Sequence, residues 1–248
     1  MRGTVPLGRA LSKLGVLSRS ESTIAIREGR VSVDGTIVRD IAHPVVPERA
    51  RIRVDGTRVA RASWRTVLLN KPRGVVTTRR DPQGRPTVFD DLGEDARSLV
   101  AVGRLDLATT GLLLLTSDTR LADWITDPLN GVPRVYVVTV RGRVTPGAVA
   151  MLLAGVRSRS ELLRAQRVTI DKASGRESRL IVELHEGRNR EIRRMCETAG
   201  HEVTRLKRVQ LGGLTLGSLP PGCWRDVTRA ELRAAFPGAP MASRPAEV

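Results

Sequence analysis

Residues 103–118 (GRLDLATTGLLLLTSD) constrain the fold most, because they join a polar loop to a continuous apolar run. The four leucines at 112–115 are bounded by glycine and threonine residues, a pattern typical of a short buried strand. Residues 99–102 form a second apolar run. We therefore expect two buried strands with Asp106 in the loop between them.

Asp106 is flanked by Leu105 and Leu107, which predicts a sheltered carboxylate. Burial of that charge costs free energy unless a positive group lies nearby. Arg104 points elsewhere if the segment is extended, so we expect the partner to come from a distant segment. Such a carboxylate is a candidate nucleophile or base. From residue type alone, an aspartate that caps a turn is an equally good interpretation.

The charge of the chain indicates a polyanionic partner: 42 lysines and arginines stand against 26 acidic residues, for a net charge of +16. Genomic base composition explains the preference for arginine over lysine equally well. We find neither an apolar run of about 18 residues nor an apolar signal core, which predicts a cytoplasmic protein with no membrane partner. Cys196, Cys223 and three histidines show no metal-ligand spacing, so we expect no metal and no disulfide.

Aromatic residues are scarce, with two phenylalanines, three tryptophans and one tyrosine. Proteins that stack successive bases of a single strand need several rings on one sheet face. We therefore expect contact with nucleic acid through phosphates, shape and a few pockets. Tyr136 is a candidate site residue, with a buried structural role as the alternative.

Residues 4–60 predict a compact basic domain of two helices followed by short strands. Apolar residues recur at helical spacing from Leu7 onward. Asp34 and Gly35 are a tight-turn signal between two strands.

Residues 66–236 predict a larger second domain, in which strands dominate and helices occur irregularly. Thr228 and Glu231 form a capping box for the last helix. This pattern indicates an α+β fold with a mixed, mainly antiparallel sheet. Residues 237–248 are rich in proline and small residues, which predicts a frayed tail.

The first domain resembles the S4 RNA-binding domain in residues 11–20 (LSKLGVLSRS) and 26–35 (IREGRVSVDG). The resemblance implies binding to folded RNA. Basic side chains on one face of the helix pair are candidates for phosphate contact, with a solvated helix face as the alternative. These candidates are Arg9, Lys13, Arg19, Arg27 and Arg30.

The second domain resembles the pseudouridine synthases of small- and large-subunit ribosomal RNA. The matching stretches are residues 103–111 (GRLDLATTG) with the leucine run, 132–140 (VPRVYVVTV), 186–195 (EGRNREIRRM) with 205–208 (RLKR), and the smaller 71–74 (KPRG). The resemblance implies that uridine in ribosomal RNA is isomerised to pseudouridine without a cofactor. Large-subunit RNA is slightly preferred over small-subunit RNA.

The same resemblance implies roles for particular residues. Asp106 would act on the sugar, either as a nucleophile or as an acid/base and ion-pair group, with Arg193 as its basic partner. Tyr136 would pack on the uracil and assist deprotonation, and Leu211 would form an apolar wall. Arg104 would fill the space left by a flipped base or grip the flanking backbone.

Further cations would hold RNA phosphates around this site: Lys71, Arg188, Arg190, Arg194, Arg205, Lys207 and Arg208. Adjacent residues of a helix diverge, so we expect Arg193 and not Arg194 to point into the cleft. Taken alone, residues 186–195 fit an exposed amphipathic helix with solvated charges. Arg134 stands where this family often has lysine, and the retained charge predicts retained activity.

A non-catalytic RNA-binding or ribosome-assembly factor is the main alternative. A buried acid weakens phosphate binding, so the combination of Asp106, Tyr136 and Arg193 favours an enzyme. A DNA-binding protein lacks support, because the chain has neither zinc-finger spacing nor basic-zipper heptads. The target uridine stays open, as does the choice between free ribosomal RNA and a ribosome assembly intermediate. Nothing in the pattern suggests a coiled coil, so we expect a monomer.

Overall fold

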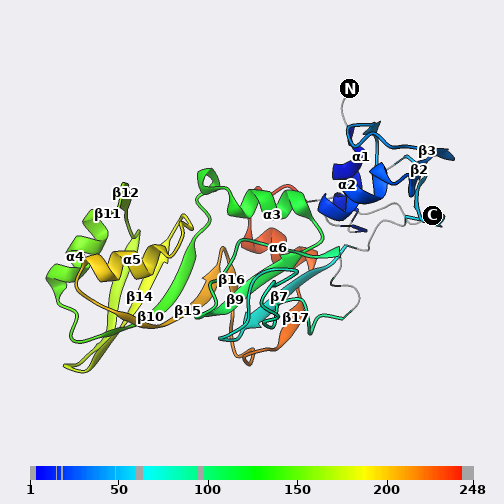
Figure 1. Ribbon diagram of the computed structural model, residues 1–248. Helices are drawn as coiled ribbons and strands as arrows, with labels where there is room; N and C mark the ends of the chain where they lie inside the picture. Colours follow the sequence, from blue (N-terminus) through cyan, green and yellow to red (C-terminus); the bar gives the residue numbers. More distant parts are fainter. Residues whose placement is uncertain are drawn as a thin grey trace. The chain divides into compact units, whose positions relative to one another are not determined.

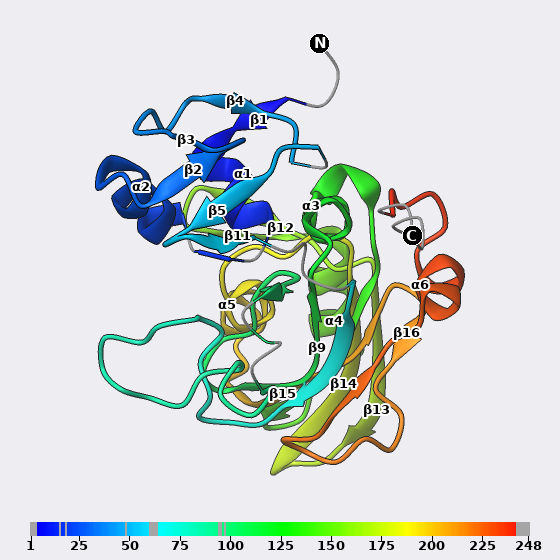
Figure 2. The same ribbon diagram turned by 90° about the vertical axis from the view of Figure 1, so that its right-hand side faces the viewer.

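The computed structural model (Figures 1 and 2) describes these parts of the chain: residues 4–14, 16–17, 19–47, 49–59, 64–93, 96 and 98–241. The chain divides into two compact units. Unit 1 comprises residues 1–64 and 94–99, and unit 2 comprises residues 65–93 and 100–248. No helix among the described residues is long and apolar enough to cross a membrane.

Unit 1 packs two helices and short strands around one apolar core. Helices α1 (Leu7–Lys13) and α2 (Arg19–Arg27) contact each other. The core includes Leu11, Ile26 and Ile52, all of them buried. A four-stranded antiparallel sheet has the order β3-β2-β5-β6, and β1 pairs with β4. The strands are β1 (Val5–Pro6), β2 (Val31–Val33), β3 (Thr36–Ile37), β4 (Pro44–Val45), β5 (Ile52–Val54) and β6 (Thr57–Arg58).

Two tight turns connect the strands of this sheet. Asp34 and Gly35 have φ angles of 50° and 93°, and Asp55 and Gly56 have φ angles of 51° and 76°. Two successive residues with positive φ form the turn that matches the twist of a hairpin, and Asp-Gly pairs tolerate it best. The predicted turn at Asp34-Gly35 is therefore confirmed.

Unit 2 is built on one sheet of nine strands, which twists along its length (Figure 2). Its main order is β13-β14-β10-β15-β9-β7-β17, with β16 paired to β15 and β8 paired to β9. The strands are β7 (Thr66–Lys71), β8 (Val100–Ala101), β9 (Thr109–Thr116), β10 (Arg134–Arg141), β13 (Arg167–Ala173), β14 (Glu177–Leu184), β15 (Val203–Leu211), β16 (Leu214–Thr215) and β17 (Trp224–Asp226).

Helices and one hairpin cover this sheet. Helices α4 and α5 lie towards β14, and α3 and α6 lie near β9 and β16 (Figure 1). These elements are α3 (Thr119–Thr126), the 3-10 helix η2 (Pro128–Asn130), α4 (Pro146–Ala154), the hairpin of β11 (Val156–Ser158) and β12 (Glu161–Leu163), α5 (Glu191–Thr198) and α6 (Arg229–Ala235). The predicted capping box of Thr228 and Glu231 opens α6 and is confirmed.

A parallel strand pair at the centre of the sheet brings together two segments that are far apart in the sequence. Strands β9 and β15 run parallel, with Gly111 opposite Arg208, whereas the other neighbouring strands of this sheet are antiparallel in the described residues. A Cβ atom at Gly111 would lie 2.2 Å from the carbonyl oxygen of Arg208, and Gly111 has a φ of 102°. Only glycine permits this approach.

The predicted fold class, α+β with a mixed and mainly antiparallel sheet, is confirmed. The four leucines at 112–115 are fully buried in β9, as the apolar run predicted. Of the predicted tail, residues 242–248 lie outside the described residues.

Candidate active site

A cavity of about 600 Å³ opens on unit 2 where β10 and β15 meet the Asp106 loop and the start of α5. Its lining includes Asp106, Tyr136, Arg190 and Leu211. The structure thus brings together residues from the three main stretches that the sequence singled out. We call this space the Asp106 cavity.

Asp106 is held by the backbone of its loop between β8 and β9. The Thr109 amide donates to the Asp106 carbonyl oxygen at 2.9 Å, and the Thr77 hydroxyl donates to the Leu105 carbonyl oxygen at 2.9 Å. The Asp106 side chain is 35% exposed. The predicted sheltered carboxylate is half-buried and not fully buried: the loop turns the side chain to the cavity, where water still reaches it.

Arg190 is the cation that approaches the Asp106 carboxylate, with 4.0 Å between Nη1 and Oδ2. The expected ion pair with Arg193 is not formed in the described residues. The Arg193 Nη1 donates to the Val203 carbonyl oxygen at 3.0 Å, and its Nε and Nη2 are buried without a described partner. Burial and the charge of Arg190 lower the Arg193 pKa, and the nearby Asp106 opposes this. The charge of Asp106 thus acts on Arg193 without a direct contact between the two side chains in the described residues.

Lys71 is buried close to Asp106, so its predicted role as an RNA contact is wrong. The side chain is fully buried, and Nζ donates to the carbonyl oxygens of Thr109 at 2.9 Å and Pro72 at 3.1 Å. Burial lowers the Lys71 pKa to about 8, and the charge of Asp106 opposes that shift. The ammonium group thus places positive charge behind the Asp106 loop.

Tyr136 and Leu211 form the apolar part of the cavity wall. Tyr136 on β10 lies opposite Arg208 on β15 and Val182 on β14. Both Tyr136 and Leu211 are buried yet line the cavity. A planar base could therefore contact an aromatic ring and an aliphatic side chain at the same depth.

Arg208 lies inside this wall and not on the RNA-facing surface that the sequence predicted. It is 3% exposed, and its Nε donates to the Leu112 carbonyl oxygen at 2.7 Å. Its Nη2 is buried and has no partner among the described residues. Residues of a strand alternate between faces, so Arg208 follows the buried Leu206, whereas Arg205 and Lys207 are exposed.

Arg134 is a structural residue of the wall, which explains why a cation is needed at this position. Its guanidinium donates to the carbonyl oxygens of Val132, His185 and Ile125, each at 2.9 Å. These three carbonyls belong to separate segments that border the cavity. Burial lowers the Arg134 pKa. The resemblance to the family predicted a positive charge at position 134 but not this clamp of three hydrogen bonds from Arg134 to backbone carbonyl oxygens.

Glu191 is a buried carboxyl group that sequence reasoning missed. Its Oε2 accepts from the Arg188 amide at 3.0 Å, and its Oε1 has no described partner. Burial raises the Glu191 pKa to about 7, with a smaller contribution from neighbouring Glu186. Glu191 opens α5 directly after Arg190 and lines the cavity.

Arg188 and Arg194 both form contacts within the protein. Arg194 is buried, so its predicted phosphate contact is wrong, whereas Arg188 is exposed at the cavity and its predicted contact stays a prediction. Arg194 is 10% exposed; it donates to Ser158 and lies 2.6 Å from a Glu161 carboxylate oxygen. Arg188 pairs with Glu186 at 2.9 Å and donates to the Leu162 carbonyl oxygen at 3.1 Å. These contacts fasten the β11–β12 hairpin to the cavity loop.

Two predicted phosphate contacts face away from Asp106. Arg205 and Lys207 are exposed on the other face of β15 from Leu206. Arg104 is exposed and lines the edge of the cavity, where it could reach RNA. Strand alternation keeps Arg205 and Lys207 out of the lining of the Asp106 cavity, and their predicted phosphate contacts stay predictions.

In unit 1, three of the arginines predicted to contact phosphate are exposed, and a fourth forms ion pairs within the unit. Arg9, Arg19 and Arg27 are exposed. Arg30 pairs with Asp55 at 2.5 Å and with Glu28 at 3.3 Å in exposed ion pairs, so its charge is partly balanced within unit 1 and its predicted phosphate contact stays a prediction. The side chain of Lys13 lies outside the described residues.

No group of three or more histidine, cysteine, aspartate or glutamate side chains in the described residues could hold a metal ion. Cys196 is buried, which raises its pKa to about 12. That thiol would stay protonated at neutral pH and is a poor nucleophile. Asp106 is therefore the better placed nucleophilic candidate in this unit.

The fold and the cavity define an enzyme that accompanies a small RNA-binding domain, and comparison with known proteins agrees. The profile of the RNA pseudouridylate synthase family matches residues 65–198, and that of the S4 domain matches residues 5–50. An uncharacterized RNA pseudouridine synthase of Aquifex aeolicus is 36% identical over 94% of this chain and 94% of its own length.

Further relatives give the same result. The ribosomal large subunit pseudouridine synthase B of Vibrio cholerae is 39% identical over 89% of this chain and 71% of its own length. A crystal structure of a pseudouridylate synthase has a TM-score of 0.64 and 29% identity, and covers 92% of this chain and 98% of that one. The chain belongs to the RNA pseudouridylate synthase family, and the predicted resemblance is confirmed.

Proposed function

We propose that this enzyme isomerises a specific uridine of large-subunit ribosomal RNA to pseudouridine, with Asp106 as the catalytic residue. The observation that carries the proposal is the position of Asp106 at the rim of a cavity walled by Tyr136 and Leu211. The name of the Vibrio cholerae relative supports large-subunit RNA as the substrate.

The reaction breaks the bond between ribose C1′ and uracil N1 and joins C5 to C1′ after the base has turned. N1 gains a proton and C5 loses one. Asp106 either attacks the sugar or removes a proton from it, and both routes need an ionised carboxylate. Arg190 lies 4.0 Å from this carboxylate, and the charge of Asp106 acts on Arg193 and Lys71.

The cavity fits a single nucleotide that has left its stack. A volume of about 600 Å³ lies within the usual range for small-molecule pockets. Tyr136 would pack on the uracil ring and Leu211 would close the apolar side, while exposed Arg104 would meet the space left behind in the RNA. Unit 1, with its S4 domain, would tether the surrounding RNA.

The test is to map pseudouridine in both ribosomal RNAs from cells with and without the gene, by carbodiimide labelling and reverse transcription. One large-subunit signal should disappear with the gene. It should return with the wild-type gene or with Asp123→Asn, a control on the exposed face of α3, but not with Asp106→Asn. If the deletion strain keeps every pseudouridine signal in both ribosomal RNAs, the RNA-binding or assembly-factor alternative is favoured instead.

Assays with purified protein test the role of Asp106 and the identity of the RNA substrate. Asp106→Asn should lower product formation by about 1,000-fold or more while RNA affinity changes by less than about twofold. Assays on free large-subunit RNA and on immature large-subunit particles would identify the physiological substrate. Light scattering checks the proposed monomer against the chain mass of 27.1 kDa.

A further inference from the structure

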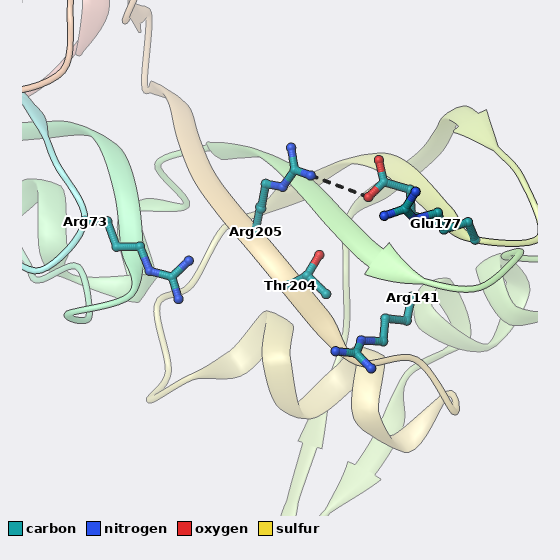
Figure 3. A pocket seen from close by; sticks show the side chains of 6 residues that line it. Arg73, Arg141, Glu177, Thr204 and Arg205 are labelled. Atoms are coloured by element: carbon teal, nitrogen blue, oxygen red, sulfur yellow. Dashed lines mark ion pairs between the residues drawn. The ribbon is translucent and has the colours of Figure 1, made fainter.

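A second basic cavity lies in unit 2, apart from the residues that line the Asp106 cavity. Its volume is about 510 Å³, and we call it the Arg141 pocket. It is lined by Arg73, Arg141, Arg176, Glu177, Thr204 and Arg205. Figure 3 shows Arg73, Arg141, Arg205 and Glu177 arranged around Thr204. The lining contains no aromatic ring.

The sheet topology brings these arginines together from distant segments. Strand β10 lies between β14 and β15, and Arg141 at the end of β10 is opposite Glu177 at the start of β14. Arg205 near the start of β15 pairs with Thr139, two residues before Arg141. Arg73 follows β7 from another part of the sheet. Gathering four guanidinium groups in this way is unfavourable unless an anion balances them.

Carboxylates within the protein balance only part of this charge. Glu177 lies 3.6 Å from Arg205 and Glu202 lies 3.0 Å from Arg141, and all four of these side chains are at least 49% exposed. Such exposed pairs contribute little to stability and exchange readily for a stronger anion. Arg73 and Arg176 form no ion pair with any part of the chain that the structure describes. The pocket therefore keeps an excess of about two positive charges.

The Arg141 pocket is linked to the Asp106 cavity through Arg73. The next residue, Gly74, donates its amide to the Leu107 carbonyl oxygen in the Asp106 loop at 3.0 Å. The positive charge of Arg73 also contributes to lowering the pKa of Arg193. The segment that supplies Arg73 to the Arg141 pocket is thus hydrogen-bonded to the loop that carries Asp106.

We propose that the Arg141 pocket binds backbone phosphates of the RNA strand that flanks the target uridine. This inference rests on the proposed function for its RNA substrate. Arginine guanidinium groups bind phosphate oxygens in pairs, and a pocket without rings offers no stacking for bases. The pocket therefore adds affinity and fixes the direction of the strand without reading its sequence.

The experiment compares two full-length variants, each with three arginine substitutions added to Asp106→Asn so that bound RNA is not converted. One carries Arg141→Gln, Arg176→Gln and Arg205→Gln. The matched control carries Arg120→Gln, Arg157→Gln and Arg233→Gln, which removes the same charge from exposed positions elsewhere in unit 2. Filter binding to transcribed large-subunit ribosomal RNA is measured from low to high salt.

We expect the pocket variant to bind about tenfold more weakly, with a slope of log affinity against log salt that is shallower by about 2. The control should stay within about twofold of its parent. Equal weakening of both variants, or weakening of neither, would overturn the proposal. Because binding is measured without turnover, failure of the proposed isomerisation would appear separately, as absence of pseudouridine with wild-type protein.

Thermal unfolding separates a binding role from a structural one. Removing like charges relieves repulsion, so the pocket variant should have a Tm equal to or above that of the control. A Tm several degrees below that of the control would assign the arginines to folding and would overturn the proposal.

Discussion

The arginines in the wall of the Asp106 cavity and those of the Arg141 pocket differ in what their guanidinium groups contact. Arg134 and Arg208 are buried and donate to backbone carbonyl oxygens. Arg73 and Arg176 are exposed and form no ion pair within the described residues. The first pair shapes a cavity, and the second pair keeps its charge available to a ligand.

The arginines of this protein therefore have two separate functions: some stabilise the fold, and others offer charge to a ligand. A buried guanidinium satisfies carbonyls that water cannot reach, so its removal costs stability. An exposed one costs little to remove from the fold but weakens binding to a polyanion.

The largest effect is expected at Gly111, because its close contact with β15 keeps Arg208 in the wall. Gly111→Ala would place Cβ 2.2 Å from the Arg208 carbonyl oxygen at a φ of 102°. We expect the free energy of unfolding to fall by about 4 kcal/mol in urea denaturation. Gly142→Ala, with a φ of 75° and open space around its Cβ, should cost only about 1–2 kcal/mol. Equal losses would show that backbone strain alone matters.

Arg134→Met tests the buried set directly. The substitution leaves three carbonyl oxygens without their donor, so we expect the free energy of unfolding to fall by about 3 kcal/mol. Arg120→Met, at an exposed position of α3, should change it by less than about 0.5 kcal/mol. If the two variants are equally stable, the proposed clamp does not hold the cavity segments.

Glu191 sharpens the comparison, because its buried carboxyl group makes stability depend on pH. Its pKa is about 7 in the folded protein and 4.5 ordinarily, so the folded state binds more protons between these values. Stability should therefore decrease by on the order of 2 kcal/mol as the pH rises from 4.5 to 7. Glu191→Gln should flatten this slope in denaturation at several pH values. Glu197→Gln, an exposed change in α5, should leave it intact.

The smallest effect is expected in unit 1, where ion pairs with carboxylates, and not burial, reduce the charge that Arg30 offers to RNA. Arg9→Gln with Arg19→Gln removes two exposed charges and should weaken RNA binding about fivefold at low salt. Arg30→Gln removes a charge already paired with Asp55 and Glu28 and should weaken it less than twofold. A larger loss from Arg30→Gln would show that RNA displaces the two carboxylates.

Local signals in the sequence were reliable guides to secondary structure. Asp34-Gly35 specifies its turn and Thr228 with Glu231 specifies a helix start, because each signal acts between neighbouring residues. The leucine run at 112–115 likewise predicts burial through its own composition. Motif spacing also directed attention to Asp106 and Tyr136, which line one cavity. Their catalytic roles stay predictions.

The environment of each charge depended on the tertiary structure. The rotation of α5 and the left-handed conformation of Arg190 place that residue, and not Arg193, beside Asp106. The pairing of β9 with β15 buries Arg208, and strand alternation sends Arg205 to the opposite face.

The sequence by itself thus determined the helices, strands and turns, the fold class and the family, because these follow from local patterns and ordered motifs. Only the tertiary structure decided that Lys71 is buried behind Asp106 and that Arg73 joins Arg141 in one pocket. Burial and charge pairing depend on strand register and helix rotation, which are set by contacts between residues far apart in the chain.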